Sequence, residues 1–119
     1  MTNFSAMSDK QLAEYLATRV MGWWLDEDGY YCSGDQETLE NVEAHYFKDD
    51  WQPCDPEHLH QAVECAEKLA NEQTIRVWYE YYAPDKMWHC GFAIPPIAER
   101  GYADNPARAL CVAVAMVKE

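Results

Sequence analysis

The chain has 119 residues, of which 49% are hydrophobic, and its three Phe, five Trp and eight Tyr are too many for a disordered tail. A formal net charge of −12, with nine bases scattered along the sequence, argues against nucleic acid or an anionic membrane as a direct ligand. The N-terminus lacks the features of a secretory signal, and no apolar run approaches the roughly 20 residues that cross a bilayer. We therefore expect a cytoplasmic protein with one domain, residues 1–119.

The first predicted element is a helix that starts at Ser8. Ser8 and Gln11 have the spacing of a capping box, and apolar residues follow at helical intervals up to Val20. Gly22 is the expected stop, because glycine readily takes the left-handed conformation at a helix end. Residues 23–25 and 30–32 then predict two short strands joined by a turn.

The negative charge is concentrated in the segment that follows the first strand. Between residues 26 and 57, eleven carboxylates stand against one base, Lys48, and account for −10 of the net −12. The segment also contains Tyr30, Tyr31, Tyr46, Phe47 and Trp51, although a solvated loop has little use for aromatic residues. Residues 33–52 show no clear period, and residues 40–47 favour a short helix. We interpret residues 26–55 as an acidic, aromatic-bearing insertion.

The second half of the chain predicts helix, hairpin, helix. Asp55-Pro56 provides an N-cap and a first-turn proline for a helix that runs to about residue 70. Residues 74–83 and 87–94 alternate as two strands, and residues 98–103 are expected to form a loop. Asn105-Pro106 starts a third helix, which is apolar on nearly every side and must be buried by the sheet and by either another helix or a second subunit.

These elements predict an α+β fold in which a small antiparallel sheet of two hairpins is sandwiched by helices, in the order α-β-β-α-β-β-α. If a second copy covers the third helix, the chain is a homodimer or larger oligomer. The candidate interface residues are then Leu110, Val112, Val114, Met116 and Val117.

Several short motifs resemble those of the phage ABA-sandwich domain family, a largely uncharacterised group of small phage and prophage proteins. They are residues 20–23 (VMGW), 51–53 (WQP), the helix at 62–69, Trp88, and 106–111 (PARALC). The resemblance implies a three-layer helix–sheet–helix fold and a phage or prophage origin, and it brings no reaction, cofactor or ligand. Residues 26–50 depart from it, because they are longer and more acidic than the family pattern.

Metal and nucleophile motifs are poorly supported. Cys54, His58 and Cys65 lack the paired spacing of structural zinc ligands, so a boundary histidine and buried thiols explain them better. A calcium loop from Asp26 fails in its middle, where Tyr31 occupies the position that requires glycine. His89 and Cys90 are neighbours on a predicted strand and point to opposite faces. We expect no metal, no cofactor and no catalytic residue, and five free cysteines.

The acidic segment is the strongest functional signal, although a solvated loop explains its acids equally well. As an interface, it predicts a non-enzymatic phage protein that binds and inhibits a host protein with a basic surface, such as a defence or nucleic-acid-handling factor. The carboxylates would then occupy the positions of nucleic-acid phosphates. The candidate residues are Asp26, Glu27, Asp28, Tyr30, Tyr31, Glu40, Glu43, Tyr46, Asp49, Asp50 and Trp51.

Two other functions remain open. One is binding or sequestering a small ligand such as a signalling nucleotide, with aromatic walls and a few arginines, although the shortage of bases argues against phosphate. The candidate residues are Trp24, Trp78, Tyr82, Trp88, Arg19, Arg76, Arg100 and Arg108. The other is an assembly component that acts only as an oligomer through the third helix.

Overall fold

In a computed structural model, residues 3–72, 76–82, 87–94, 97–103 and 105–118 are described, with side chains for residues 3–71 and 105–118. Within these residues the chain forms three α-helices and two three-stranded antiparallel sheets, which confirms the α+β class. The helices are α1 (Asp9–Tyr15), α2 (Leu59–Glu72) and α3 (Pro106–Lys118). The sheets are β1 (Trp24–Leu25), β2 (Tyr30–Ser33) and β3 (Glu43–Phe47), and β4 (Arg76–Tyr82), β5 (Met87–Ile94) and β6 (Ile97–Ala103).

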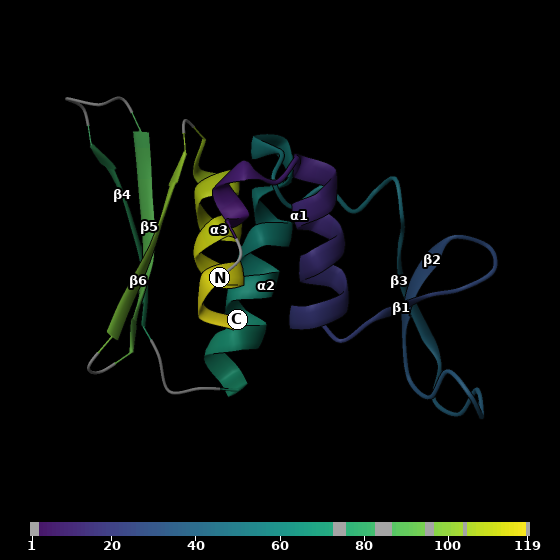
Figure 1. The fold of residues 1–119 in the computed structure, drawn as a ribbon. Helices are drawn as coiled ribbons and strands as arrows, with labels where there is room; N and C mark the ends of the chain where they lie inside the picture. Colours follow the sequence, from purple (N-terminus) through teal and green to yellow (C-terminus); the bar gives the residue numbers. More distant parts are fainter. Residues whose placement is uncertain (1–2, 73–75, 83–86, 95–96, 104, 119) are drawn as a thin grey trace.

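The helices lie together between the two sheets (Figure 1). α3 contacts β5 and β6 on one side and contacts α2 and α1 on the other. This position explains why α3 is apolar nearly all round, since a helix covered on two sides needs few polar positions. The expected packing of helices against a small antiparallel sheet is therefore present, and a second sheet lies beyond the helices. The two predicted hairpins, β1–β2 and β4–β5, do not form one sheet as expected. Each belongs to its own sheet, which is completed by β3 or β6 respectively.

Both third strands were missed by the sequence patterns. The short helix expected over residues 40–47 is wrong, because residues 43–47 pair with β2 instead. Leu39 and Asn41 have φ angles of 60° and 56°, which a right-handed helix does not accept. The loop expected over residues 98–103 is also wrong, because β6 pairs with β5 in an unbroken register from Trp88 opposite Ala103 to Ile94 opposite Ile97.

The helix starts were predicted correctly. Ser8 and Gln11 form the reciprocal capping box of α1, which continues into a π-helical turn over Leu16–Val20 before Gly22 at φ 73°. Asp55 accepts a hydrogen bond from the backbone N–H of Glu57 at 2.9 Å, and a 3-10 turn over Pro56–His58 leads into α2. Asn105 Oδ1 accepts from the N–H of Arg108 at 2.7 Å at the start of α3.

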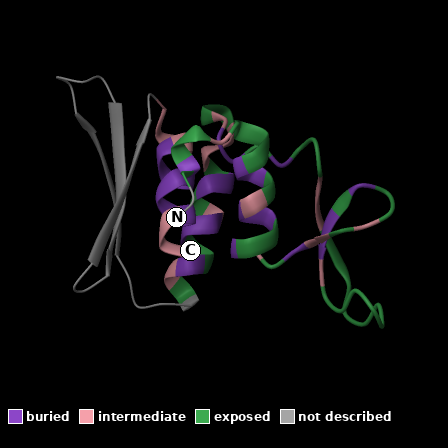
Figure 2. Cartoon of the chain, in the orientation of Figure 1, coloured by how far each residue is buried: buried purple, intermediate pink, exposed green. Residues whose placement is uncertain are grey.

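The described core lies where the three helices meet (Figure 2). Four cysteines of the described region, Cys32, Cys54, Cys65 and Cys111, are free and buried, as expected, while Cys90 lies outside the described side chains. Burial raises the pKa of Cys65 and of Cys111 well above that of an ordinary thiol, so both stay protonated at neutral pH. No helix in the described ranges is long and apolar enough to cross a membrane.

The sheet β1–β3 projects from the helical body as an arm (Figure 1), a name we use for residues 24–47. The molecule is correspondingly elongated, with extents of 50 × 29 × 26 Å. The arm contains much of the acidic segment, residues 26–55, that was expected to be an insertion. Because the arm projects from the helical body, its acidic residues lie away from the core.

Candidate partner-binding arm and adjoining groove

The tip of the β1–β2 turn is built around the carboxylate of Asp26. Asp26 Oδ1 accepts hydrogen bonds from the backbone N–H groups of Tyr30 at 2.8 Å and of Asp28 at 2.9 Å. These bonds favour the ionised form, and the one from Tyr30 contributes most to lowering the pKa of Asp26. The predicted turn is thus confirmed, and Asp26 shapes the backbone that presents Glu27 and Asp28 to solvent.

The β2–β3 loop contains a second turn of the same kind. Asp35 Oδ1 accepts hydrogen bonds from the backbone N–H groups of Thr38 and Glu37, and these bonds lower the pKa of Asp35. Gly34 has a φ of 100°, and a Cβ there would lie 2.5 Å from the backbone oxygen of Asn41, so only glycine fits. The loop is therefore a defined structure, in which Leu39 takes the uncommon left-handed conformation for a bulky residue.

An aromatic cluster at the base of the arm joins it to the helices. Trp23 is its centre: the His45 ring stacks on it with centroids 4.7 Å apart, and Trp51 meets it edge-on at 5.0 Å. Tyr31 and Tyr46 complete the cluster at 6.3 and 5.9 Å from Trp23. The register shift between Tyr31 and Cys32 is a β-bulge, which lets the consecutive residues His45 and Tyr46 both contact Trp23.

This cluster corrects three of the expected binding residues. Tyr31 and Trp51 are only 5% and 3% exposed, and Tyr46 is half-buried with its hydroxyl donating to Glu64 Oε2 on α2 at 3.0 Å. They were expected as apolar anchors for a partner. They lie inward instead, because a three-stranded sheet has little core of its own and is held by packing on the helices.

The segment that leads from the arm to α2 is fixed by one buried polar side chain. Gln61, 2% exposed, accepts a hydrogen bond from the N–H of Gln52 at 2.7 Å and donates one to the carbonyl of Asp50 at 2.9 Å. These two bonds hold the backbone on either side of Trp51, whose ring is thereby directed into the core. Asp49 and Asp50 remain exposed beside this segment.

The outer part of the arm carries most of the large exposed apolar side chains of the described region. Of the five such residues, Leu25, Tyr30, Leu39 and Val42 are on the arm, and Leu39 is 67% exposed. Only Val63 lies elsewhere, on α2. Between residues 24 and 47 there are seven carboxylates and no lysine or arginine. The arm therefore presents apolar groups within a uniformly negative field.

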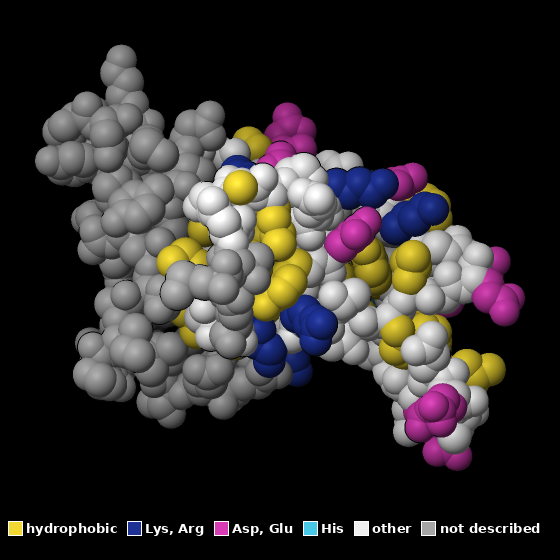
Figure 3. Space-filling model, in the orientation of Figure 1, with side chains coloured by type: hydrophobic (Ala, Val, Ile, Leu, Met, Phe, Trp, Pro, Cys, Tyr) yellow, Lys and Arg dark blue, Asp and Glu magenta, His cyan; other side chains and the backbone are white. Residues whose placement is uncertain are grey.

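The expected acidic residues do not all converge. Asp26, Glu27, Asp28, Glu40 and Glu43 belong to the arm, whereas Asp49 and Asp50 belong to the connection at its base. Figure 3 shows acidic side chains at separate places on the arm and on the helical body. The acids thus lie at separate places rather than in one patch. The acid-rich part that also carries exposed apolar groups is residues 25–43.

The oligomer interface expected on the third helix is not available in this fold. Leu110, Val112 and Val114 are at most 3% exposed within the single chain, and Met116 and Val117 pack against the same core. The sequence predicted that α3 is covered by the sheet on one side and by either another helix or a second subunit on the other. In the structure, α2 and α1 cover that other side.

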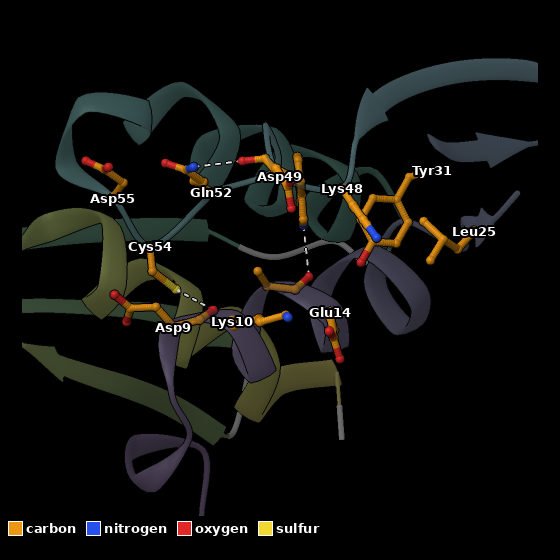
Figure 4. A pocket seen from close by; sticks show the side chains of 12 residues that line it. Asp9, Lys10, Glu14, Leu25, Tyr31, Lys48, Asp49, Gln52, Cys54 and Asp55 are labelled. Atoms are coloured by element: carbon orange, nitrogen blue, oxygen red, sulfur yellow. Dashed lines mark hydrogen bonds between the residues drawn. The ribbon is translucent and has the colours of Figure 1, made fainter. Parts of the chain in front are cut away.

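A groove runs between α1 and the segment from Lys48 to Asp55, next to the base of the arm (Figure 4). Its volume is about 680 Å³, and buried Tyr31, Trp51 and Cys54 contribute to its lining. Burial, followed by the nearby charge of Glu14, raises the pKa of Tyr31, which keeps this phenol neutral. The whole lining consists of Asp9, Lys10, Ala13, Glu14, Leu25, Tyr31, Lys48, Asp49, Trp51, Gln52, Cys54 and Asp55.

No group of three or more His, Cys, Asp or Glu side chains suited to a metal ion occurs among the residues that could be searched. Cys111 instead donates a hydrogen bond to the carbonyl of Pro53 at 3.3 Å, and His58 Nδ1 lies 3.7 Å from Asp55 Oδ2. Of the arginines considered for a phosphate ligand, Arg108 is already bound to Asp9 and to the carbonyls of Ser5 and Met7.

No model of a known protein family matches the chain, and no curated protein matches it either. Among solved structures, the fold is similar to that of a phage protein from Bacillus cereus ATCC 14579, with a TM-score of 0.64. The comparison covers 97% of this chain and 96% of that one, at 12% sequence identity. The likeness extends over almost the entire chain, including the arm, and concerns the fold.

Proposed function

We propose that this chain is a phage or prophage protein without enzymatic activity that binds and inhibits a host protein through its arm. The observation that carries the proposal is the coincidence of Leu25, Tyr30, Leu39 and Val42 with seven carboxylates and no base on one projecting unit. Exposed apolar groups supply most of the binding energy at an interface, and a one-signed field selects an oppositely charged partner. The partner is therefore a protein with a basic surface, such as a nucleic-acid-handling or defence factor.

Two further observations support the arm as the contact. Leu39 holds a left-handed backbone conformation in a loop fixed by Asp35 and Gly34, and such strain is concentrated at functional sites. The fold likeness to a phage protein supports the origin. The other candidate functions have less support, since Arg108 is occupied, α3 is internal, and Trp24 donates its indole N–H to the carbonyl of Gly34.

The test is capture of partners from a bacterial host lysate, followed by binding and activity assays with each purified candidate. A Leu39→Ala/Val42→Ala variant should weaken binding by about tenfold or more, since two apolar contacts are lost. Val63→Ala is the matched control, because Val63 is an exposed apolar residue on α2. Its affinity should equal that of the unchanged protein.

Charge is tested separately with Glu27→Gln/Asp28→Asn/Glu40→Gln/Glu43→Gln, which spares Asp26 and Asp35 and so leaves both turns intact. The control is Glu57→Gln/Glu67→Gln, which changes one exposed residue in the 3-10 turn before α2 and one on α2 itself. The arm variant should bind more slowly and with a weaker dependence on salt. The proposal would be overturned if neither the apolar nor the charge variants of the arm changed the affinity for the partner. It would also be overturned if a saturating amount of this protein left the partner's activity unchanged.

A further inference from the structure

The groove beside the arm has the dimensions of a ligand site and two facing walls. Its volume of about 680 Å³ lies within the range of small-ligand pockets. α1 provides one wall, and the segment from Lys48 to Asp55 provides the other (Figure 4). Ala13, Trp51 and Cys54 are buried beneath the opening, and the indole N–H of Trp51 is already bound to the carbonyl of Ala13. The floor is therefore largely apolar.

Four charged side chains in the groove lining have no oppositely charged partner within the described side chains. Lys10 and Glu14 come from α1, and Lys48 and Asp49 come from the facing wall. In the part of the chain with described side chains, none of these four forms an ion pair, although two ammonium groups and two carboxylates line the same hollow. Asp9, in contrast, is paired with Arg108. Asp55, whose carboxylate lies 3.7 Å from His58 Nδ1, also lines the groove. The groove thus offers both signs of charge, with more carboxylates than ammonium groups.

We propose that this groove binds a dipolar ligand of the peptide class: a short extended segment with an ammonium or guanidinium group at one position and a carboxylate at another. A ligand with one sign of charge would gain from the groups of opposite sign and be repelled by the groups of its own sign. A dipolar peptide satisfies both signs, and its aliphatic stems can cover the apolar floor. The site shares Leu25 with the exposed apolar residues of the arm but does not include Tyr30, Leu39 or Val42.

The test uses four capped tetrapeptides as probes: Lys-Ala-Ala-Glu, Lys-Ala-Ala-Lys, Glu-Ala-Ala-Glu and Gln-Ala-Ala-Gln. Each is titrated into isotope-labelled full-length protein while amide shifts are followed by NMR. The dipolar peptide should shift the amides of residues 9–14 and 48–55 at millimolar concentration, and the three others should bind more weakly. Lys10→Gln/Lys48→Gln should weaken the dipolar peptide about fivefold, as expected for two partly solvated ion pairs.

Arg19→Gln is the control, since Arg19 is exposed and is not part of the groove lining. It should leave the titration unchanged. Equal shifts with all four peptides, no shifts with the dipolar one, or an undiminished response in the lysine double variant would each overturn the proposal. Leu39→Ala/Val42→Ala should retain the peptide shifts, so that failure of the groove site and failure of the arm as a partner surface are distinguishable.

Discussion

The indole Nε1 of Trp51 donates a hydrogen bond of 2.9 Å to the backbone carbonyl of Ala13, across 38 residues of sequence. This bond connects the segment between arm and α2 to the middle of α1. Trp51 also contacts Trp23 and Tyr46, so one side chain joins α1, the arm and the connection to α2. The orientation of the arm on the helical body depends on it.

Replacing Trp51 with Phe should lower the free energy of unfolding by about 1–2 kcal/mol, because the ring is largely preserved but the hydrogen bond to Ala13 is lost. Trp51→Ala should cost about 3–5 kcal/mol, since it leaves a cavity among buried aromatic rings. Chemical denaturation measures both. Leu25→Ala, at an exposed position, is the control and should stay within about 0.5 kcal/mol. Equal stability of Trp51→Phe and the unchanged protein would contradict the role of the bond.

Gln61→Leu should destabilise the fold by about 2–4 kcal/mol, because the N–H of Gln52 and the carbonyl of Asp50 lose their partner. Hydrogen exchange should accelerate at the amide of Gln52, and chemical denaturation gives the free energy. His60→Leu is the comparison, since it changes an exposed neighbour on the same helix. If both variants had the same stability, the two bonds of Gln61 would not hold the segment.

Stability should fall between pH 10 and pH 12 through Tyr46. Burial, followed by the hydrogen bond to Glu64, raises the pKa of Tyr46 from 10.0 to about 12. The folded state therefore favours the neutral phenol, and its contribution is complete below pH 10 and is lost as the pH rises through the folded pKa. Tyr46→Phe should remove this part of the alkaline decline, measured by denaturation at several pH values. An unchanged alkaline profile in the variant would refute it.

At acid pH, the β1–β2 turn should weaken through Asp26. Its folded pKa is lower than the usual 3.8, chiefly through the bond from the N–H of Tyr30, so its contribution is present above pH 4 and is lost as the pH falls through the folded value. The amide resonances of Asp28 and Tyr30 should follow this titration by NMR. In Asp26→Asn, which keeps an oxygen acceptor but has no charge, the same resonances should not titrate with this midpoint.

The elements that the sequence predicted well are those determined by local chemistry. Asp55-Pro56 and Asn105-Pro106 begin helices because the cap acceptor and the proline act within four residues. The apolar character of α3 likewise predicted burial on two sides. None of these inferences required knowledge of which distant segments meet.

The features that were missed depend on distant pairing. β3 is a strand because β2 offers it an edge, and no pattern within residues 40–47 indicates that partner. The bulge at Tyr31 then determines which aromatic rings face Trp23, so Tyr31, Tyr46 and Trp51 could not be assigned to the interior from their acidic neighbourhood. The groove was also missed, because its walls are residues 9–14 and 48–55, which only the tertiary fold brings together.

The way the arm is attached has an evolutionary consequence. Its connection to the body depends on a few rings around Trp23, whereas the turn at Glu27 and Asp28 and the loop at Leu39 and Val42 contact solvent. Substitutions at those two tips leave the packing of α1, α2 and α3 untouched. Under the proposed function, a lineage that carries this fold can therefore change the recognition residues at the tips while the helical body stays constant. The same separation makes the tips suitable sites for grafting new recognition sequences.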